Sequence, residues 1–485
     1  MNPIDLTIII VYLVTITVVG LLISRRVHSA RDFFLAGRSL TWWVIGLSII
    51  GTNIGANDYV GASGGAYQVG IAQANFEWIG AIPAMILASF VFIPLYWRAG
   101  VYSTPEYLGL RYNSTVRLMA ASIASIFSVF AIAVALWAIA ITLQSYLDWP
   151  IWVGILVTGT VVGLYSISGG LAAVAFTDAL QVSIMFVGGV AIMWLGIHEV
   201  GGLSQFADKL STQNPDHLKV YLPADHESFP WPGVVLGLGL VLSPAYWCGG
   251  QAILQRTLAA RTQWDASAAM MFAAFAKTFV PLLIVFPGML ALVMQAEIEY
   301  PDMSLPWVVK NVLPPGLSGL MFIAIIAALQ SSLDSSLNST ALMITRDIRG
   351  VLMKQPEPEH DLTIGRWITF ILLILGMTFA PFIGDFGGIY SFIQTLLSLF
   401  QGPMLALLIM GAFTTTTTPA AGVTTIITGV TLAALLMLSD LNMLYVAANT
   451  FVYAILCLLI VSRYSTAKPV GEIASLVYRW RTADG

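Results

Sequence analysis

The chain has 485 residues, of which 58% are hydrophobic and only 9% are charged. Soluble domains carry about 25% charged residues, so this composition excludes an ordinary soluble protein. The net charge of −4 comes with no cluster of basic residues, which excludes nucleic acid as a partner. Apolar runs of about 20 residues, the length a helix needs to cross a bilayer, recur along the chain. The expected environment is therefore a lipid bilayer.

Hydropathy and helix breakers predict an all-α polytopic membrane protein with thirteen spanning helices. They cover residues 5–24, 41–63, 74–97, 117–146, 150–168, 176–197, 232–255, 266–295, 316–345, 364–384, 388–411, 418–438 and 441–462. The first run lacks the basic leader and cleavage site of a signal peptide, so we expect it to be retained. Cys248 and Cys457 both lie in apolar segments and predict neither a disulfide nor a cysteine metal site.

The connections between these spans alternate in charge. All but four of the 21 Lys and Arg fall on one side of the membrane, whereas Lys209, Lys219 and Lys310 fall on the other and Lys277 lies within a span. The positive-inside rule then predicts a plasma (inner) membrane protein with its N-terminus outside and its C-terminus in the cytoplasm. Residues 199–230 form an external cap, and residues 466–485 form either an interfacial helix or a solvated tail.

Five ionisable residues lie inside or at the ends of apolar helices. They are Asp58, Glu77, Asp178, Lys277 and Asp334. A charged side chain at the centre of a spanning helix costs about 2.5–3.5 kcal/mol on insertion scales, so such residues face a cavity, a partner or an ion. A structural ion pair, or a side chain that extends to the membrane surface, is the alternative for each one taken singly.

Two predicted spans contain helix breakers at mid-membrane depth. Residues 50–58 and residues 242–250 both mix glycine with polar residues, and the second run also contains Pro244. Unwound backbone at this depth is tolerated where it lines a cavity. The two spans are the first and sixth of a ten-helix set that starts at residue 41, which is the pattern of a transporter binding site between inverted repeats. Two harmless kinks are the alternative.

The segment 327–340 is rich in hydroxyl side chains. Ser331, Ser332, Ser335 and Ser336 surround Asp334 on a helix that is otherwise apolar. Sodium is a hard cation and favours oxygen ligands, so this density of hydroxyls beside an acid favours a sodium site. Serine can instead bond to its own helix or join neighbouring helices.

Together with other motifs, these residues resemble the sodium/solute symporter family over nearly the whole chain. The most similar members are the sodium/glucose and sodium/galactose cotransporters. The motifs that carry the resemblance are Ala-Gly-Arg-Ser at 36–39, Asn53-Ile54 with Gly61 and Ser63, Phe76-Glu77-Trp78, Ser168-Gly169-Gly170 with Thr177-Asp178 and Gln181, Tyr246-Trp247 with residues 255–258, the serine-rich segment and Phe392-Ile393-Gln394.

The resemblance implies a LeuT-type fold, which is a five-plus-five inverted repeat. The repeats are expected at 41–198 and 232–411, after an extra N-terminal helix and cytoplasmic loop at 1–40. An extracellular loop at 199–231 joins them. Two C-terminal helices at 412–462 and a cytoplasmic tail at 463–485 follow.

The resemblance also implies a sodium site on the first broken helix and the serine-rich helix. Its ligands are the carbonyl groups of Gly51, Ile54 and Ala328 and the hydroxyl groups of Ser331 and Ser332. A second sodium position, found in some members, is implied at Asp178, Ser335 and Asp334. Asp334 stands where a hydroxyl residue is usual, so it either strengthens this second cation site or replaces it with a proton-linked one.

The sugar contacts of the cotransporters carry over to a third set of residues. Asn53, Glu77, Tyr246, Lys277 and Gln394 match in type, and Trp247 stands beside them. Two positions depart from the pattern: Ser243 replaces another small polar residue, and Asp58 replaces Gln or His. The added carboxylate of Asp58 favours an amino-bearing or otherwise modified solute.

The expected function is secondary active transport, in which inward sodium flux drives uptake of a small polyhydroxylated solute by alternating access. The alternative is a sodium symporter for a non-sugar solute, such as an amino acid, a carboxylate or a sialic-acid-like compound. A proton-linked carrier or a channel fits less well, because the polar residues gather at mid-depth and do not line a continuous path. No enzyme is expected, since no nucleophile or metal constellation is evident, and no obligate protein partner is expected.

Overall fold

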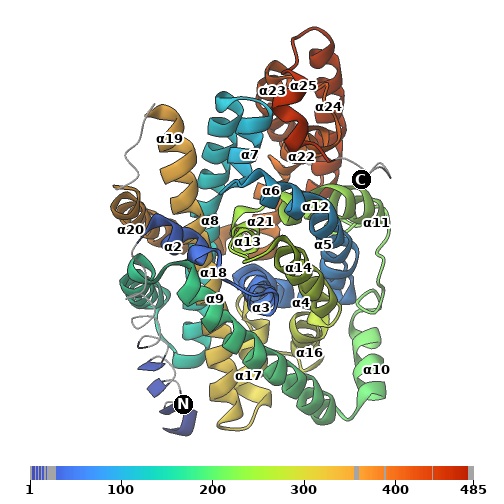
Figure 1. Ribbon diagram of the computed structural model, residues 1–485. Helices are drawn as coiled ribbons and strands as arrows, with labels where there is room; N and C mark the ends of the chain where they lie inside the picture. Colours follow the sequence, from blue (N-terminus) through green and yellow to red (C-terminus); the bar gives the residue numbers. More distant parts are fainter. Residues whose placement is uncertain are drawn as a thin grey trace.

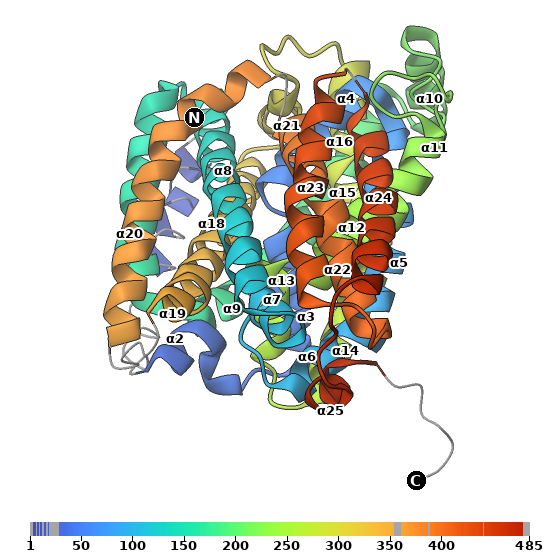
Figure 2. The same ribbon diagram turned by 90° about the horizontal axis from the view of Figure 1, so that it is seen from above.

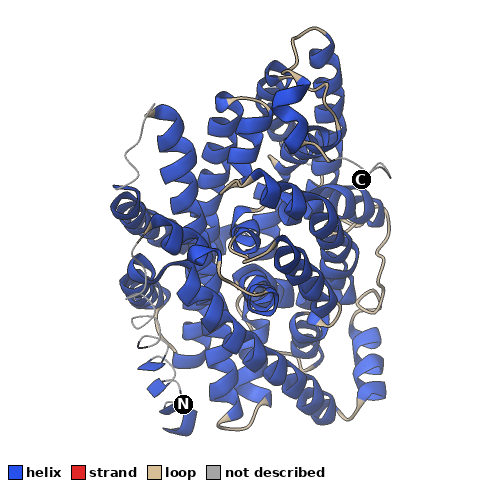
Figure 3. Cartoon of the chain, in the orientation of Figure 1, coloured by secondary structure: helices blue, strands red, loops and turns tan. Residues whose placement is uncertain are grey.

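The computed structural model describes residues 29–353, 360–386, 389–439 and 441–478, together with residues 3–5, 7, 8, 10, 11, 14, 15 and 18. Much of the first predicted span, 5–24, therefore lies outside the described residues. Within the described residues the chain is built of helices, and the only β-type pairing there is two isolated bridges (Figure 3). The prediction of an all-α protein is confirmed.

The helices of the apolar layer are α3 (Trp42–Asn53), α4 (Ala62–Val69), α5 (Ile82–Leu87), α6 (Ile93–Ala99), α8 (Ser114–Leu147), α9 (Ile151–Val200), α12 (Ser243–Gly249), α13 (Gln251–Leu258), α14 (Gln263–Lys277), α15 (Val280–Ile284), α16 (Phe286–Val293), α18 (Leu317–Leu342), α20 (Asp361–Phe379), α21 (Ile389–Ser398), α22 (Gln401–Phe413), α23 (Pro419–Met437) and α24 (Met443–Arg463). Wider π-helical turns extend several of them, at Ala56–Gly61, Phe76–Ala81, Ala88–Phe92, Val234–Leu242 and Met343–Ile348.

Shorter helices are α2 (Ala30–Leu35), α7 (Thr104–Arg111), α10 (Leu203–Gln213), α11 (Trp231–Gly233), α17 (Ser304–Val312), α19 (Arg349–Leu352) and α25 (Val470–Ile473). Among the described residues, eight helices are long and apolar enough to cross a membrane, or up to ten if each bent pair is one span. The structure supports a polytopic membrane protein, but it does not confirm the predicted count of thirteen.

The basic connections gather at one end of the molecule. Figure 2 shows α2, α7, α19 and α25 at this end, which we call the basic end, and α10 at the opposite end. Several cations there hold the connections together: the Arg117 guanidinium lies 2.8 Å from the Asp347 carboxylate, and Lys468 Nζ donates to the Leu110 carbonyl at 2.9 Å. The predicted division of charge between the two sides is therefore visible in the fold.

Helix α18 lies at the centre of the bundle (Figure 1) and packs against α8, α9 and α3. Its most apolar window is 83% buried, more than in any other candidate span of the described residues. At its N-terminus, Asp5 Oδ1 accepts hydrogen bonds from the backbone N–H groups of Gly316 at 2.7 Å and Gly319 at 3.0 Å. A carboxylate at this position satisfies free N–H groups and complements the helix dipole. The serine-rich segment thus belongs to a rigid central element.

Both predicted breaks are present. Helix α3 stops at Asn53, because Ile54 leaves helical geometry with a ψ of 58°, and the Gly55 N–H donates to the Asn53 carbonyl at 2.7 Å. In a continuous helix that N–H would bond to the Gly51 carbonyl. The second break falls at Gly250, where extended backbone with a ψ of 116° separates α12 from α13. This break lies at the very end of the predicted run, since Pro244 sits in the first turn of α12, where proline is tolerated.

The structure differs in detail from the predicted spans in three places. The residues between the expected spans 150–168 and 176–197 are also helical, so both spans belong to α9; the two glycines there each cost only about 1 kcal/mol in a helix. The expected spans 266–295 and 388–411 are each bent, by 52° and 50°. Pro281 accounts for the first bend, because helices usually end just before a proline. Pro403, in the first turn of α22, accounts for the second bend, at Leu399 and Phe400, because it has no N–H to donate to the Leu399 carbonyl.

The polar insert contains a helix, and the tail differs from expectation. The insert contains the amphipathic helix α10, which buries Phe206 and Leu210. The tail forms α25 and then packs on the protein, where the Leu476 carbonyl accepts a hydrogen bond from the Tyr107 hydroxyl at 3.0 Å. Over the described residues 470–478 the tail is therefore neither a long interfacial helix nor a solvated segment, and residues 479–485 lie outside the described part.

A buried carboxylate ties the link between α16 and α17 to the start of α21. Asp302 is 3% exposed, and its Oδ2 accepts the Ile389 N–H at 2.9 Å. Burial raises the pKa of Asp302 to about 7, against the opposing effect of this hydrogen bond. Because the pKa in the folded state exceeds the ordinary value, the stability that Asp302 contributes is present in acid and is lost as pH rises from about 4 through about 7.

We expect Asp302→Asn to remove this part of the pH dependence. The amide keeps an oxygen for the Ile389 N–H but carries no charge, so the midpoint of thermal unfolding at pH 8 should exceed that of the wild type by about 2 °C or more. The measurement is thermal unfolding in detergent at pH 5 and pH 8. Asp216→Asn, at an exposed loop position, is the matched control and should leave the midpoint at pH 8 unchanged. A wild-type pH slope in Asp302→Asn would contradict the assignment.

Candidate functional site

The two breaks face a single cavity of about 250 Å³. All eight residues expected to contact the solute line it: Asn53, Asp58, Glu77, Ser243, Tyr246, Trp247, Lys277 and Gln394. They come from the turns on either side of the first break, from Phe76–Ala81, and from α12, α14 and α21. Residues scattered over more than 340 positions of sequence thus meet at one place. The cavity is mostly apolar with a few converging polar groups, as small-molecule sites usually are.

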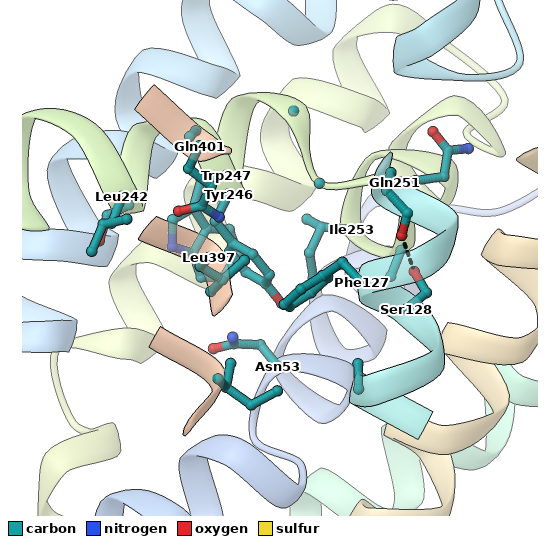
Figure 4. Close-up of a pocket in the computed structure, with 18 of the residues that line it drawn as sticks. Asn53, Phe127, Ser128, Leu242, Tyr246, Trp247, Gln251, Ile253, Leu397 and Gln401 are labelled. Atoms are coloured by element: carbon teal, nitrogen blue, oxygen red, sulfur yellow. Dashed lines mark hydrogen bonds between the residues drawn. The ribbon is translucent and has the colours of Figure 1, made fainter. Parts of the chain in front are cut away.

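Figure 4 shows how these side chains surround the cavity. Tyr246, Trp247 and Leu397 stand on one side, Phe127 stands opposite, and Asn53 closes the space from the broken end of α3. The Tyr246 and Trp247 rings meet edge to face with centroids 5.4 Å apart. Aromatic faces of this kind pack against the C–H groups of a ring or chain and leave its polar groups to hydrogen bonding.

A buried ion pair crosses the cavity. Lys277 Nζ lies 2.7 Å from Glu77 Oε1, and the two side chains are only 1% and 4% exposed. The same ammonium lies 5.8 Å from the centroid of the Trp247 ring, within cation–π range. Lys277 is the one cation among the described residues that line the cavity. Neither member of such a pair can be removed without leaving the other charge buried.

Two buried acceptors at the cavity have no hydrogen-bond partner among the residues that the structure describes. These are Asn53 Oδ1 and Glu77 Oε2. An unsatisfied buried polar atom costs about 1–3 kcal/mol, so a native structure keeps one where something else binds. Two further acceptors of this kind, Gln401 Oε1 and Thr104 Oγ1, belong to cavity residues that the sequence did not single out. A ligand rich in hydroxyl or amine donors would satisfy this set.

The cavity extends toward the basic end and is closed at the α10 end. Its lining continues from Asn53 to Thr104 and Pro105, in the first turn of α7. On the other side, α4 and α16 touch so closely that a Cβ added to Gly288 would lie 2.0 Å from the Ser63 carbonyl oxygen. The Ser63 hydroxyl also pairs with that of Ser304 at 3.1 Å. Access from the α10 end would require these elements to separate.

The broken end of α3 rests directly on the serine-rich segment of α18. The Ser332 hydroxyl donates to the Thr52 carbonyl at 2.7 Å, and a Cβ added to Gly55 would lie 1.5 Å from Ser332 Oγ. Only glycine therefore fits at position 55, a constraint that the sequence analysis did not identify. Ala328 lies one turn before Ser332 on the same face of α18. The break in α3 and Ser332, both part of the expected sodium site, are thus in direct contact.

Asp178, expected at the second cation position, contacts α3 and α18. Asp178, on α9, accepts hydrogen bonds from the hydroxyls of Ser331 and of Ser48, the latter at 2.5 Å. Gly51 lies against it, since an added Cβ there would be 3.2 Å from Asp178 Cβ. The Thr52 hydroxyl lies 3.3 Å from that of Ser335. The two positions therefore share α3 and α18.

Arg256 stands in the middle of this second position, and sequence analysis missed it. Its Nη2 lies 3.5 Å from Asp178 Oδ2, and both side chains are at most 1% exposed. The guanidinium donates to Ser48 Oγ at 2.8 Å, to Ser335 Oγ at 2.5 Å and to the Ala252 carbonyl at 2.7 Å. Asp334, 6% exposed, lies within electrostatic reach of it.

Arg256 was grouped with the basic loop residues because it comes just after the predicted span 232–255. The structure instead places it in α13, of which every residue but Ala252 is buried. The available signal was the helical run Gln251–Leu258, which contains no turn residue and therefore could not be a loop.

The chain matches known transporters along most of its length. The profile of the sodium:solute symporter family covers residues 33–429. The sodium/glucose cotransporter of Vibrio parahaemolyticus is 30% identical over 96% of this chain and 90% of its own. Sodium/glucose cotransporter 1 of Oryctolagus cuniculus is 32% identical, and sodium/myo-inositol cotransporter 2 of Mus musculus is 31% identical, each over 85% of this chain and 68% or 67% of its own.

Solved structures share the fold. A sodium-coupled sialic acid symporter in a substrate-bound, outward-open state aligns with a TM-score of 0.86 over 96% of this chain and 99% of its own, at 22% identity. A nucleobase-cation symporter in a closed conformation aligns with a TM-score of 0.60 over 92% of this chain and 97% of its own, at 12% identity. The predicted LeuT-type inverted repeat is confirmed as the fold class. With its profile match and its 30% identical relative, the chain belongs to the sodium:solute symporter family and is a sodium-coupled transporter, not an enzyme.

Proposed function

We propose that this symporter takes up a small polyhydroxylated solute, a sugar or a sugar-like compound, into the cavity between the two breaks. The observation that carries the proposal is the pair of unpartnered buried acceptors, Asn53 Oδ1 and Glu77 Oε2, beside an aromatic wall. Hydroxyl groups would donate to these oxygens while the C–H face of the solute packs on Tyr246 and Trp247. The glucose and myo-inositol named for the relatives belong to this class.

Within this proposal each cavity residue has a role. Glu77 and Asn53 accept hydrogen bonds, Lys277 and Gln394 donate them, and Ser243 does either. Two carboxylates, Asp58 and Glu77, disfavour an acidic solute such as a carboxylate or a sialic-acid-like compound, because it would bring a like charge into a buried site.

Sodium is proposed to bind where α3 meets α18. Its ligands are the carbonyl groups of Gly51, Ile54 and Ala328 and the hydroxyl groups of Ser331 and Ser332. The break supports this assignment, since it releases backbone carbonyls at the depth where a hard cation needs them. A second sodium position is proposed at Asp178, Ser335 and Asp334, where an ion would share the carboxylates with the Arg256 guanidinium.

Sodium binding and solute binding are coupled because the ion contacts both α3 and α18. An ion held by both α3 and α18 stabilises the arrangement in which the break completes the solute cavity, so sodium binding and solute binding favour the same state. We propose that the repeats, residues 41–198 and 232–411, then move against each other. Each positive charge that enters gains about 2.3 kcal/mol per 100 mV of membrane potential, which drives accumulation of the solute.

We place the basic end in the cytoplasm of the plasma (inner) membrane, with the N-terminus outside and the C-terminus inside. The positive-inside rule supports this orientation, because α2, α7, α19 and the tail carry the cations. The α10 end is then external, with residues 199–231 as its outer loop. Residues 1–40 and 412–485 add the flanking helix, the two C-terminal helices and the tail. In this orientation the cavity faces inward.

Ser332→Ala tests the sodium assignment. The substitution removes a ligand hydroxyl and its hydrogen bond to the Thr52 carbonyl, so the sodium concentration for half-maximal uptake should rise about tenfold or more, as expected for the loss of one oxygen ligand. The measurement is sodium-stimulated sugar uptake into proteoliposomes. Ser183→Ala is the matched control, since Ser183 is exposed on α9 and bonds only within its own helix, to the Ala179 carbonyl.

Gln394→Ala separates the two sites. It should weaken solute affinity while leaving the sodium dependence of thermal stability intact. Unchanged sodium stimulation in Ser332→Ala would reject the sodium site, and parallel loss of sodium and solute responses in Gln394→Ala would mean misfolding.

A further inference from the structure

Asp58 is the cavity residue that a neutral sugar leaves unexplained. It follows the break in α3, is 6% exposed and lines the same cavity as Glu77 and Lys277. Both charges act on it electrostatically, yet among the described residues none forms an ion pair or hydrogen bond with its carboxylate. A buried carboxylate without a partner costs several kcal/mol, so it requires a compensating group.

The cavity has one carboxylate more than it can neutralise itself. Lys277 already lies 2.7 Å from Glu77 Oε1 and is the one cation among the described lining residues. When Asp58 and Glu77 are both ionised, the described lining of the cavity therefore carries one net negative charge. From this charge balance we propose that the natural solute carries a protonated amine beside its hydroxyl groups, as an amino sugar or another polyhydroxylated amine does.

The unpartnered atoms of the cavity suit an ammonium group. A hydroxyl has one donor hydrogen, whereas an ammonium has three and no acceptor. Asn53 Oδ1 and Glu77 Oε2 are both unpaired acceptors, and the Asp58 carboxylate adds two more oxygens. Trp247 already faces one cation, Lys277, across 5.8 Å, so its ring presents the electron-rich surface that a second cation also favours. The site is thus rich in acceptors and poor in donors.

This inference rests on the proposed function, because it assumes that the solute binds in this cavity. The amine inference and the proposed function are tested separately by comparing each amino sugar with its parent sugar and its N-acetyl derivative. The parent lacks the charge, and the N-acetyl form keeps the nitrogen but neutralises it. Glucosamine, galactosamine and mannosamine supply three such series.

Binding is measured by calorimetry on purified full-length protein, with and without sodium. In the wild type, one free amine should bind about 10- to 100-fold more tightly than both its parent sugar and its N-acetyl form, the range of a charge-assisted hydrogen bond. In Asp58→Asn this preference should fall to less than about threefold. Asp216→Asn, in the exposed loop, is the control and should keep the preference.

The outcomes are distinct. Sodium-dependent binding of a parent sugar as tight as that of its amine would overturn the amine inference and leave the proposed function standing. A sodium-independent, pH-gradient-driven uptake of a parent sugar that Asp58→Asn abolishes would also overturn it, because Asp58 would then carry a proton. Absence of sodium-dependent binding across all three series would overturn the proposed function itself.

Discussion

Replacing Lys277 with methionine is expected to destabilise the protein strongly, whereas replacing its partner Glu77 with glutamine is expected to destabilise it far less. Lys277→Met leaves two carboxylates, Glu77 and Asp58, in a cavity whose described lining then holds no cation. Breaking a buried pair in this way costs about 3–5 kcal/mol of unfolding free energy. Glu77→Gln leaves Lys277 near Asp58, so the charges still balance, and the loss is that of one charge-assisted hydrogen bond, about 1.5–3 kcal/mol.

The measurement is thermal unfolding of each variant in detergent, without solute. The double variant Glu77→Gln with Lys277→Met should unfold closer to the wild type than Lys277→Met alone, since it leaves only Asp58 uncompensated. Lys219→Met is the matched control, because that lysine pairs with Asp216 at a site where both side chains are 55% exposed. Equal losses in the two single variants would contradict the charge balance inferred for the cavity.

Replacing Arg256 with methionine is expected to destabilise the whole protein. Asp178 is fully buried and would keep its charge without the guanidinium, at a cost of about 3–5 kcal/mol of unfolding free energy. The Ser48 and Ser335 hydroxyls would lose their donor at the same time. The expected result is a sharply lower yield of monodisperse protein and a lower midpoint of thermal unfolding in detergent.

The double variant Arg256→Met with Asp178→Leu separates stability from transport. Removing both charges from a buried site is often neutral for stability, so the midpoint should recover toward that of the wild type. Sodium stimulation should not recover, because Asp178 is proposed to hold the second ion. Lys219→Met again serves as the exposed control and should cost less than about 1 kcal/mol. If Arg256→Met alone were as stable as the wild type, the prediction that the Arg256–Asp178 pair stabilises the fold would be wrong.

The two ion pairs show why burial alone does not define a transport residue. Glu77 and Lys277 line a cavity, and one oxygen of Glu77 has no partner, so this pair is arranged for a ligand. Arg256 and Asp178 lie outside the cavity lining and bond to hydroxyls and a carbonyl on several helices. The first pair is proposed to select the solute, and the second to join α9, α13 and α18.

Local composition was sufficient to predict the membrane environment and the chemical type of the expected ligand groups. A low fraction of charge forces helices in a bilayer, because every backbone polar group must be satisfied internally there. Glycine and polar residues at mid-depth were sufficient to predict a break in each of the two helices, although the second break lies at the end of its predicted run. These signals are readable because each depends on residues that are neighbours in the chain.

Features that depend on contacts between residues far apart in the chain could be found only in the tertiary structure. Arg256 was taken for a loop cation because the predicted span ended at residue 255 and its partner, Asp178, lies 78 positions earlier. Gly55 was overlooked because Ser332, the side chain it accommodates, lies on another helix. The sequence predicted a helical membrane protein with oxygen ligands for sodium and named Asp58, Glu77 and Lys277 as solute contacts. Only the fold shows that these three side chains line one cavity and that Lys277 is paired with Glu77, because both facts depend on contacts between distant helices, and the proposed amine solute rests on them.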